Sequence, residues 1–200
     1  MRKKLLVAIC LCVSMSMVSA QKVTEGSLAF LKGVEELHFN FDYKGMMIKK
    51  QTEQQYVAEQ VREKNKDKKG EGDEWKTAWE TSDREYIQEV FLKDYNAEIA
   101  GIGPEGGDFP NANYVATVKT IWLDPGYMAG PVTKISTVTV EVTITKKGSS
   151  KVLAKVLIKK AKGNYYDMAN TYSTDARRIG SSYGEAGEKI GKAIAKIINK

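Results

Sequence analysis

The chain has 200 residues, 42% of them hydrophobic, and its 31 basic and 25 acidic residues give a net charge of +6. This length suits one ordinary domain, which can bury most of its apolar surface. The charges are spread along the chain without a basic cluster interleaved with aromatic residues, so the composition argues against a nucleic-acid partner.

The first twenty residues have the pattern of a secretory signal peptide. Three basic residues at 2–4 precede an apolar run over 5–13, and residues 18–20 are the small or short side chains that a signal peptidase requires. The apolar run is shorter than the ~20 residues of a membrane-spanning helix. We therefore expect cleavage after Ala20, release from the membrane, and a mature chain that begins at Gln21.

The leader also holds both cysteines, Cys10 and Cys12. Neither follows the small residue of a lipoprotein cleavage site, so no lipid anchor is expected. The mature chain would have no disulfide, thiol nucleophile or thiolate metal site. It would carry 28 basic residues against 25 acidic ones, a net charge of +3. We expect one domain over 21–200, located in the periplasm or outside the cell.

The first regular elements of the mature chain are a strand and a helix. Residues 21–33 show no pattern and could form a short tail or a helical turn. Over 34–43, apolar residues alternate with polar ones, which is the period of a half-buried strand. Thr52 and Gln55 have the spacing of a capping box, which predicts a helix to about Glu63. The segment 64–74 is almost entirely charged or polar and is predicted to be a solvated loop.

The middle of the chain contains two tryptophans and a second helix. Trp75 and Trp79 are four residues apart and would share one face of a helical turn. Ser82 and Glu85 match a second capping box, and the apolar residues that follow predict a helix that ends near Ala97. Glycine and proline then indicate a loop over 101–110.

Three strands are predicted after this loop, over 113–123, 137–145 and 152–158, because apolar and polar residues alternate in each. The Asp-Pro-Gly sequence at 124–126 predicts a turn in which glycine takes a positive φ. A polar segment at 146–150 joins the last two strands into a hairpin.

The chain closes with an amphipathic helix from about Asp175 to Lys200. Its apolar residues recur at three- and four-residue spacing. Beside them runs a stripe of small residues whose glycines are Gly180, Gly184, Gly187 and Gly191. Each glycine costs a helix about 1 kcal/mol relative to alanine, so the stripe indicates close approach of another element or a partner. Packing inside the domain is the preferred interpretation, and an exposed interface is the alternative.

The order of these elements predicts an α+β fold. We expect a mostly antiparallel sheet of four or slightly more strands, with helices packed on one face and the C-terminal helix closing the domain.

Several short motifs match catalytic or binding patterns by spacing alone. The glycines of 101–106 fit a dinucleotide-binding loop, but they follow a helix and precede no helix. Ser182 occupies the centre of a G-x-S-x-G match, yet it lies within a helical pattern, and the one histidine, His38, precedes it. The polar segment 65–70 faintly matches a calcium loop, but Lys69 stands where an oxygen ligand is needed and Lys76 replaces the closing glutamate. No cofactor or metal is therefore expected, and the sequence does not indicate an enzyme.

Two other sets of residues suggest weaker alternatives. An aromatic surface for a lipid or glycan could form from Trp75, Trp79, Tyr127, Tyr165 and Tyr166. A hydrolase would need two converging carboxylates, and its candidates are Glu35, Glu36, Asp42, Asp124 and Glu141. No spacing singles out any two of them.

With these residues in view, the chain resembles the small exported envelope proteins of Bacteroidetes whose function is unknown. It is also loosely similar to the amino-terminal α/β domain of TolB-type proteins. The resemblance covers about 34–199 and rests on the strand 39–43, the helix end at 91–96 and the closing helix with its glycines. It implies a fold and a compartment but no activity.

The leading hypothesis is a non-enzymatic, soluble envelope protein, periplasmic or secreted, that binds another envelope protein or assists assembly. A small-molecule carrier for a lipid or glycan is the alternative, and a carboxylate-dependent hydrolase is a third hypothesis.

Overall fold

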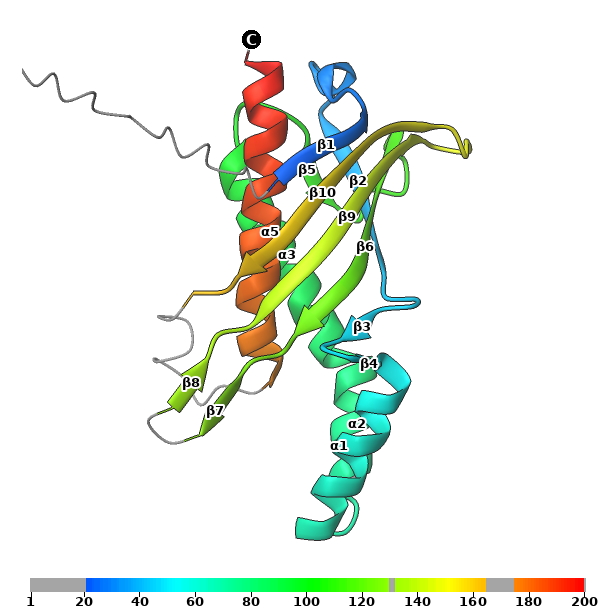
Figure 1. The fold of residues 1–200 in the computed structure, drawn as a ribbon. Coiled ribbons are helices and arrows are strands. Elements are labelled where there is room, and N and C mark those ends of the chain that lie inside the picture. The colour runs from blue at the N-terminus through cyan, green and yellow to red at the C-terminus, as the bar shows by residue number, and fades with distance from the viewer. Residues whose placement is uncertain (1–20, 130–131, 165–174, 200) are drawn as a thin grey trace, which may run out of the picture.

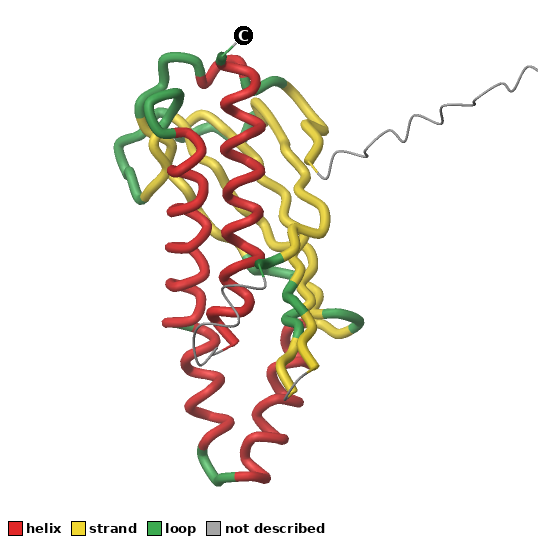
Figure 2. Tube along the Cα trace, turned by 90° about the vertical axis from the view of Figure 1, so that its left-hand side faces the viewer, coloured by secondary structure: helices red, strands yellow, loops and turns green. Residues whose placement is uncertain are grey.

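The computed structural model describes residues 21–129, 132–164 and 175–199. Two long helices, α3 (Ser82–Ile99) and α5 (Asp175–Ile198), lie side by side and cover one face of an eight-stranded sheet (Figures 1 and 2). The expected α+β class and the expected C-terminal helix are confirmed.

The sheet is larger than predicted. Its strands are β1 (Gln21–Gly26), β2 (Glu36–Asp42), β3 (Met47–Ile48), β4 (Gln51–Thr52), β5 (Glu105–Gly107), β6 (Tyr114–Asp124), β9 (Thr137–Lys146) and β10 (Val152–Lys162). The main path runs β1-β10-β9-β6-β2-β5, and β3 pairs with both β4 and the end of β6. The strands expected over 34–43, 113–123, 137–145 and 152–158 correspond to β2, β6, β9 and β10.

The sheet is mixed, which corrects the expectation of a mostly antiparallel one. β1, β10, β9 and β6 pair antiparallel, whereas β2 pairs parallel with both β5 and β6. Helices α1–α3 lie between β2 and β6 in the chain, and a strand reached through a helical crossover returns parallel to the first. Alternation of side chains within a strand does not reveal the direction of its neighbour.

The short strands at the two sheet edges were not predicted from the sequence. Residues 21–26, expected as a tail or a helical turn, form edge strand β1, which pairs with β10 from Gln21 opposite Ile158. At the other edge, β5 lies inside the expected loop 101–110. A short 3-10 helix, η1 (Ala29–Leu31), follows β1.

The β6–β9 pair continues into a separate two-stranded ribbon, β7 (Tyr127–Ala129) and β8 (Val132–Lys134), that extends beyond the main sheet (Figure 1). The turn at 124–126 connects β6 to this ribbon. Gly126 has a φ of +67°, as the Asp-Pro-Gly sequence predicts.

A helical hairpin of α1 (Glu53–Asp67) and α2 (Glu71–Glu80) projects from the same end of the sheet (Figures 1 and 2). The predicted capping box is present, because Gln55 N donates to Thr52 Oγ1 and Thr52 N donates to Gln55 Oε1. The predicted capping box at Ser82 is wrong, because Thr81 occupies the N-cap of α3 and makes no capping bond through its side chain.

The charged loop expected over 64–74 is also wrong, because the turn between α1 and α2 is confined to 68–70. Asn65 stabilises this turn: its Oδ1 accepts from Gly70 N at 3.0 Å and from Gly72 N at 2.9 Å. Gly72 lets the helices approach closely, because a Cβ there would collide with the Val61 backbone. The segment 64–74 has no apolar pattern. Its helical ends are stabilised by hydrogen bonds from N–H groups at the start of α2 to Asn65 and by the close contact at Gly72.

The main core lies between the sheet and the α3–α5 pair. Its largest fully buried side chains include Tyr95, Tyr183, Phe91, Leu37, Ile144 and Ile158. The opposite sheet face has no covering element among the described residues, and its side chains are mostly polar. Lys119 faces Glu141 across β6 and β9, and Thr117 faces Thr143. This pairing of charges and hydroxyls suits a face in contact with water.

Candidate functional site

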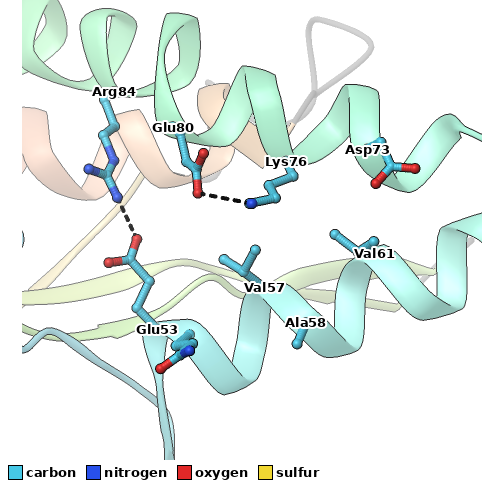
Figure 3. Close-up of a pocket in the computed structure, with 9 residues that line it drawn as sticks. Glu53, Val57, Ala58, Val61, Asp73, Lys76, Glu80 and Arg84 are labelled. Atoms are coloured by element: carbon cyan, nitrogen blue, oxygen red, sulfur yellow. Dashed lines mark hydrogen bonds and ion pairs between the residues drawn. The ribbon is translucent and has the colours of Figure 1, made fainter.

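A groove of about 570 Å³ runs between α1 and the α2–α3 segment (Figure 3). Its apolar floor consists of Val57, Ala58 and Val61, which share one face of α1. Val57 is buried, Val61 is half-buried and Ala58 is exposed. Side chains of α2 and α3 form the opposite wall. The groove is therefore an apolar strip open to solvent between two antiparallel helices.

Paired charges border this strip. Arg84 Nη2 donates to Glu53 Oε1 at 2.6 Å, and the same carboxylate oxygen accepts from Trp79 Nε1 at 2.9 Å. Further along the wall, Lys76 lies 3.9 Å from Glu80. Figure 3 shows both ion pairs beside the apolar residues of α1. Because these charges already have partners, the groove offers an apolar contact with little uncompensated charge.

An aromatic cluster holds the hairpin together beside the groove. The Trp75 and Trp79 rings stack with centroids 5.4 Å apart, and the Tyr56 ring lies 6.2 Å and 5.7 Å from them. Trp75 Nε1 donates to Asp175 Oδ2 at 3.2 Å, which links the hairpin to the start of α5. Burial, and then the nearby Asp175 carboxylate, raises the pKa of the Tyr56 hydroxyl above its usual value. Tyr56 therefore stays neutral and serves as a packing residue.

The predicted aromatic surface is brought together only in part. Trp75 and Trp79 meet, but Trp79 is 4% exposed and cannot present its ring to a ligand. Tyr127 lies apart from them on the ribbon and is 45% exposed. Tyr165 and Tyr166 lie outside the described residues. The tryptophans thus act as the core of the hairpin.

The predicted glycine stripe faces α3. A Cβ on Gly187 would lie 2.1 Å from the Phe91 carbonyl oxygen, and one on Gly191 would lie 2.8 Å from Glu98 Cβ. Gly184 approaches Asp94, and Gly180 approaches the Tyr86 ring. All four glycines are buried. The stripe is occupied by packing inside the molecule, in agreement with the preferred interpretation.

Ser182, the centre of the G-x-S-x-G match, is a buried structural residue. It is 0% exposed, its Oγ donates to the Ile179 carbonyl, and it lies 3.0 Å from Ser136 Oγ. His38 lies on β2, where its Nδ1 accepts from Phe109 N at 3.1 Å. The serine and the histidine thus have separate structural roles.

The carboxylates proposed for a hydrolase lie in several places, with Glu35 and Glu36 adjacent at the start of β2 and Asp42 at its end. Asp124 pairs with Lys134 at the base of the ribbon, whereas Glu141 faces Lys119 on the open sheet face. Burial alone would raise the pKa of the Asp124 carboxyl, but the Lys134 ammonium and the Gly126 N–H outweigh burial and lower it. Across the described ranges, no group of three His, Cys, Asp or Glu side chains is arranged to hold a metal ion.

Comparison of the chain with known protein families, with curated proteins and with solved structures finds no match. In the part of the chain that the structure describes, no helix combines the length and apolar composition needed to cross a membrane.

The apolar residues of the hairpin are visible in the sequence, although nothing there marks a groove. Val57 and Val61 form a thin apolar face on one helix. Trp75 and Trp79, four residues apart, form a second apolar face. Reading both segments as one helical hairpin would have placed these faces against each other. The polar composition of 64–74 concealed that hairpin.

Proposed function

We propose that this protein is an exported, non-enzymatic protein-binding module whose partner docks in the groove between α1 and the α2–α3 segment. The observation that carries this proposal is the groove itself, an apolar strip with already paired charges on a hairpin that projects from the main body.

The shape of the groove favours an amphipathic helix as the partner segment. Two antiparallel helices with an apolar strip between them accept a third helix, which buries its own apolar face there. Lys76 and Glu80 on the wall can then contact polar residues at the edges of the incoming helix. Export rests on the predicted leader over 1–20 and would place the partner in the periplasm or outside the cell.

A carrier that encloses a lipid or glycan inside the fold has less support. The internal cavity between Tyr43, Trp79 and Tyr183 has a volume of about 10 Å³, room for about one water molecule at most. The hydrolase hypothesis has less support still, because Asp124 lies at the base of the ribbon, Glu141 on the open sheet face, and Glu35 and Glu36 at the start of β2.

A substitution in the groove tests the docking proposal. Ala58→Arg places a long charged side chain over the apolar strip, while the exposed position leaves the helix intact. The wild-type chain, used as bait in an extract of the producing cells, should retain a partner that binds at least tenfold more weakly to the Ala58→Arg variant.

Ala97→Arg is the matched control, because Ala97 is an exposed alanine near the far end of α3. It should bind the partner as the wild type does. Equal partner affinity for both variants, with circular dichroism showing both folded, would reject the groove as the docking site.

A further inference from the structure

A second concave surface lies at the opposite end of β2 from the helical hairpin. Two segments form it, residues 30–36, which lead into β2, and residues 111–114, which lead into β6. The cavity has a volume of about 570 Å³, within the ~300–1,000 Å³ range of small-molecule sites. Neither the hairpin nor the glycine stripe contributes to it.

The walls of this cavity are held in place by the body of the protein. The Phe30 and Tyr114 rings pack with centroids 5.1 Å apart and join the two segments. The Glu35 carbonyl accepts from Glu105 N at 2.8 Å, and the Asn113 carbonyl accepts from Lys147 N at 2.8 Å. A site with fixed walls loses less conformational entropy when it binds a ligand.

The polar side chains of the cavity, in contrast, are free to bind. Within the described part of the chain, the side chains of Glu35, Glu36, Asn111 and Asn113 make no hydrogen bond or ion pair. All four residues are exposed. The lining of this concavity thus includes two residues with carboxylates, which accept hydrogen bonds, and two with amides, which both donate and accept.

We propose that this cavity binds a neutral saccharide. Hydroxyl groups both donate and accept, so they can pair with the carboxylates and with the amides at once. The Phe30 and Tyr114 rings provide an apolar wall against the C–H face of a sugar ring.

Other ligand classes fit the lining less well. An anionic ligand would meet two glutamates and a single lysine, Lys32. A lipid chain would remove water from Glu35, Glu36 and both amides without replacing their hydrogen bonds. A basic peptide would match the two carboxylates, but its charges would be repelled by Lys32 in the same lining.

An array of neutral oligosaccharides tests the proposal. The labelled mature protein should bind at least one saccharide on the array, and the Asn111→Ala/Asn113→Ala double variant should bind the same saccharide at least tenfold more weakly in calorimetry. Both substitutions remove exposed side chains without protein partners, so the urea midpoint of unfolding should stay unchanged.

Gln54→Ala is the matched control, because it removes an exposed amide at the hairpin groove. It should bind the saccharide as the wild type does, and so should Ala58→Arg, which separates this site from the protein-docking groove. The proposal would be overturned if the wild type bound no neutral oligosaccharide, or if the double variant bound the saccharide equally well. It would also be overturned if the protein bound pentalysine in a salt-sensitive manner and no saccharide.

Discussion

Asp124 shows how one carboxylate fixes the connection between the main sheet and the ribbon. Its Oδ1 accepts from Gly126 N at 3.0 Å, and its side chain pairs with Lys134 on β8. Its carbonyl oxygen accepts from the buried Ser136 hydroxyl at 3.1 Å. The turn, the ribbon and the start of β9 therefore depend on this residue.

Replacing Asp124 with asparagine should lower the free energy of unfolding by about 1–2 kcal/mol at neutral pH, because a part-buried charge-assisted contact with Lys134 is lost. The pKa of Asp124 lies below its usual value of 3.8 in the folded state. Its ionised form therefore stabilises the fold above that value, and this contribution is lost as the pH falls through the lowered pKa. Urea unfolding at pH 7 and between pH 4 and 2 should show the difference between wild type and variant shrinking in acid.

Glu89→Gln provides the control, because Glu89 is an exposed carboxylate on α3. It should leave the stability almost unchanged at every pH. A difference for Asp124→Asn that stays constant down to pH 2 would contradict a stabilising charge at this position.

At the scale of elements, the packing of α5 on α3 depends on how closely each glycine of α5 approaches atoms of α3. A Cβ on Gly187 would meet the Phe91 carbonyl oxygen, which belongs to a rigid helix backbone. A Cβ on Gly180 would lie 3.0 Å from the edge of the Tyr86 ring. Tyr86 is 37% exposed, so its ring can move aside.

The two alanine substitutions should therefore differ in effect. Gly187→Ala should destabilise the protein by about 2–3 kcal/mol, because the helices must separate. Gly180→Ala should change stability by less than about 1 kcal/mol, because the gain in helix propensity offsets the mild crowding. Urea unfolding of both variants measures the contrast, and equal losses would show that close approach at Gly187 does not govern this packing.

Elements with a strong internal period could be predicted from the sequence. The glycines and isoleucines of α5 recur at helical spacing, and β9 alternates valine with threonine, so both elements were placed almost to the residue. β1 has six residues and only one partly buried apolar side chain, Val23, so its strand character comes from pairing with β10. Pairing across the sheet is a tertiary property that local alternation cannot show.

The candidate site was less predictable than the fold. Val57 and Trp79 were visible as apolar residues, but the groove exists because Asn65 turns the chain within three residues. The cavity at Phe30 and Tyr114 combines segments about eighty positions apart in the chain. The polar residues of this cavity have no spacing in the sequence that would identify them as parts of one site.

At the scale of the whole molecule, the chain consists of a body and a projecting hairpin. The sheet and the α3–α5 pair share one large core, whereas α1 and α2 contribute Val57 and Trp79 as their buried apolar side chains. Glu53 ties α1 to α2 and α3 through Trp79 and Arg84. The two proposed binding surfaces lie on different parts of this arrangement, so one chain can hold both ligands at once.

Hydrogen exchange should reveal this division. We expect the amides of α1 and α2 to exchange through local opening well before those of β9, because the hairpin buries less apolar surface and depends on a few polar contacts. Glu53→Gln keeps the shape of the side chain but removes its charge from the contact with Arg84. It should speed exchange in the hairpin about tenfold, which corresponds to about 1.4 kcal/mol, and leave β9 unchanged.

Glu63→Gln is the matched control on the same helix. Glu63 pairs with Lys66 at 2.9 Å and with Arg62 at 3.1 Å, so both of its partners lie on α1 itself. An exposed pair within one helix contributes little to docking of that helix. Exchange in this variant should therefore match the wild type. If Glu53→Gln instead accelerated exchange equally in the hairpin and in β9, the hairpin would open only when the whole molecule unfolds. The hairpin and the body would then form one cooperative unit.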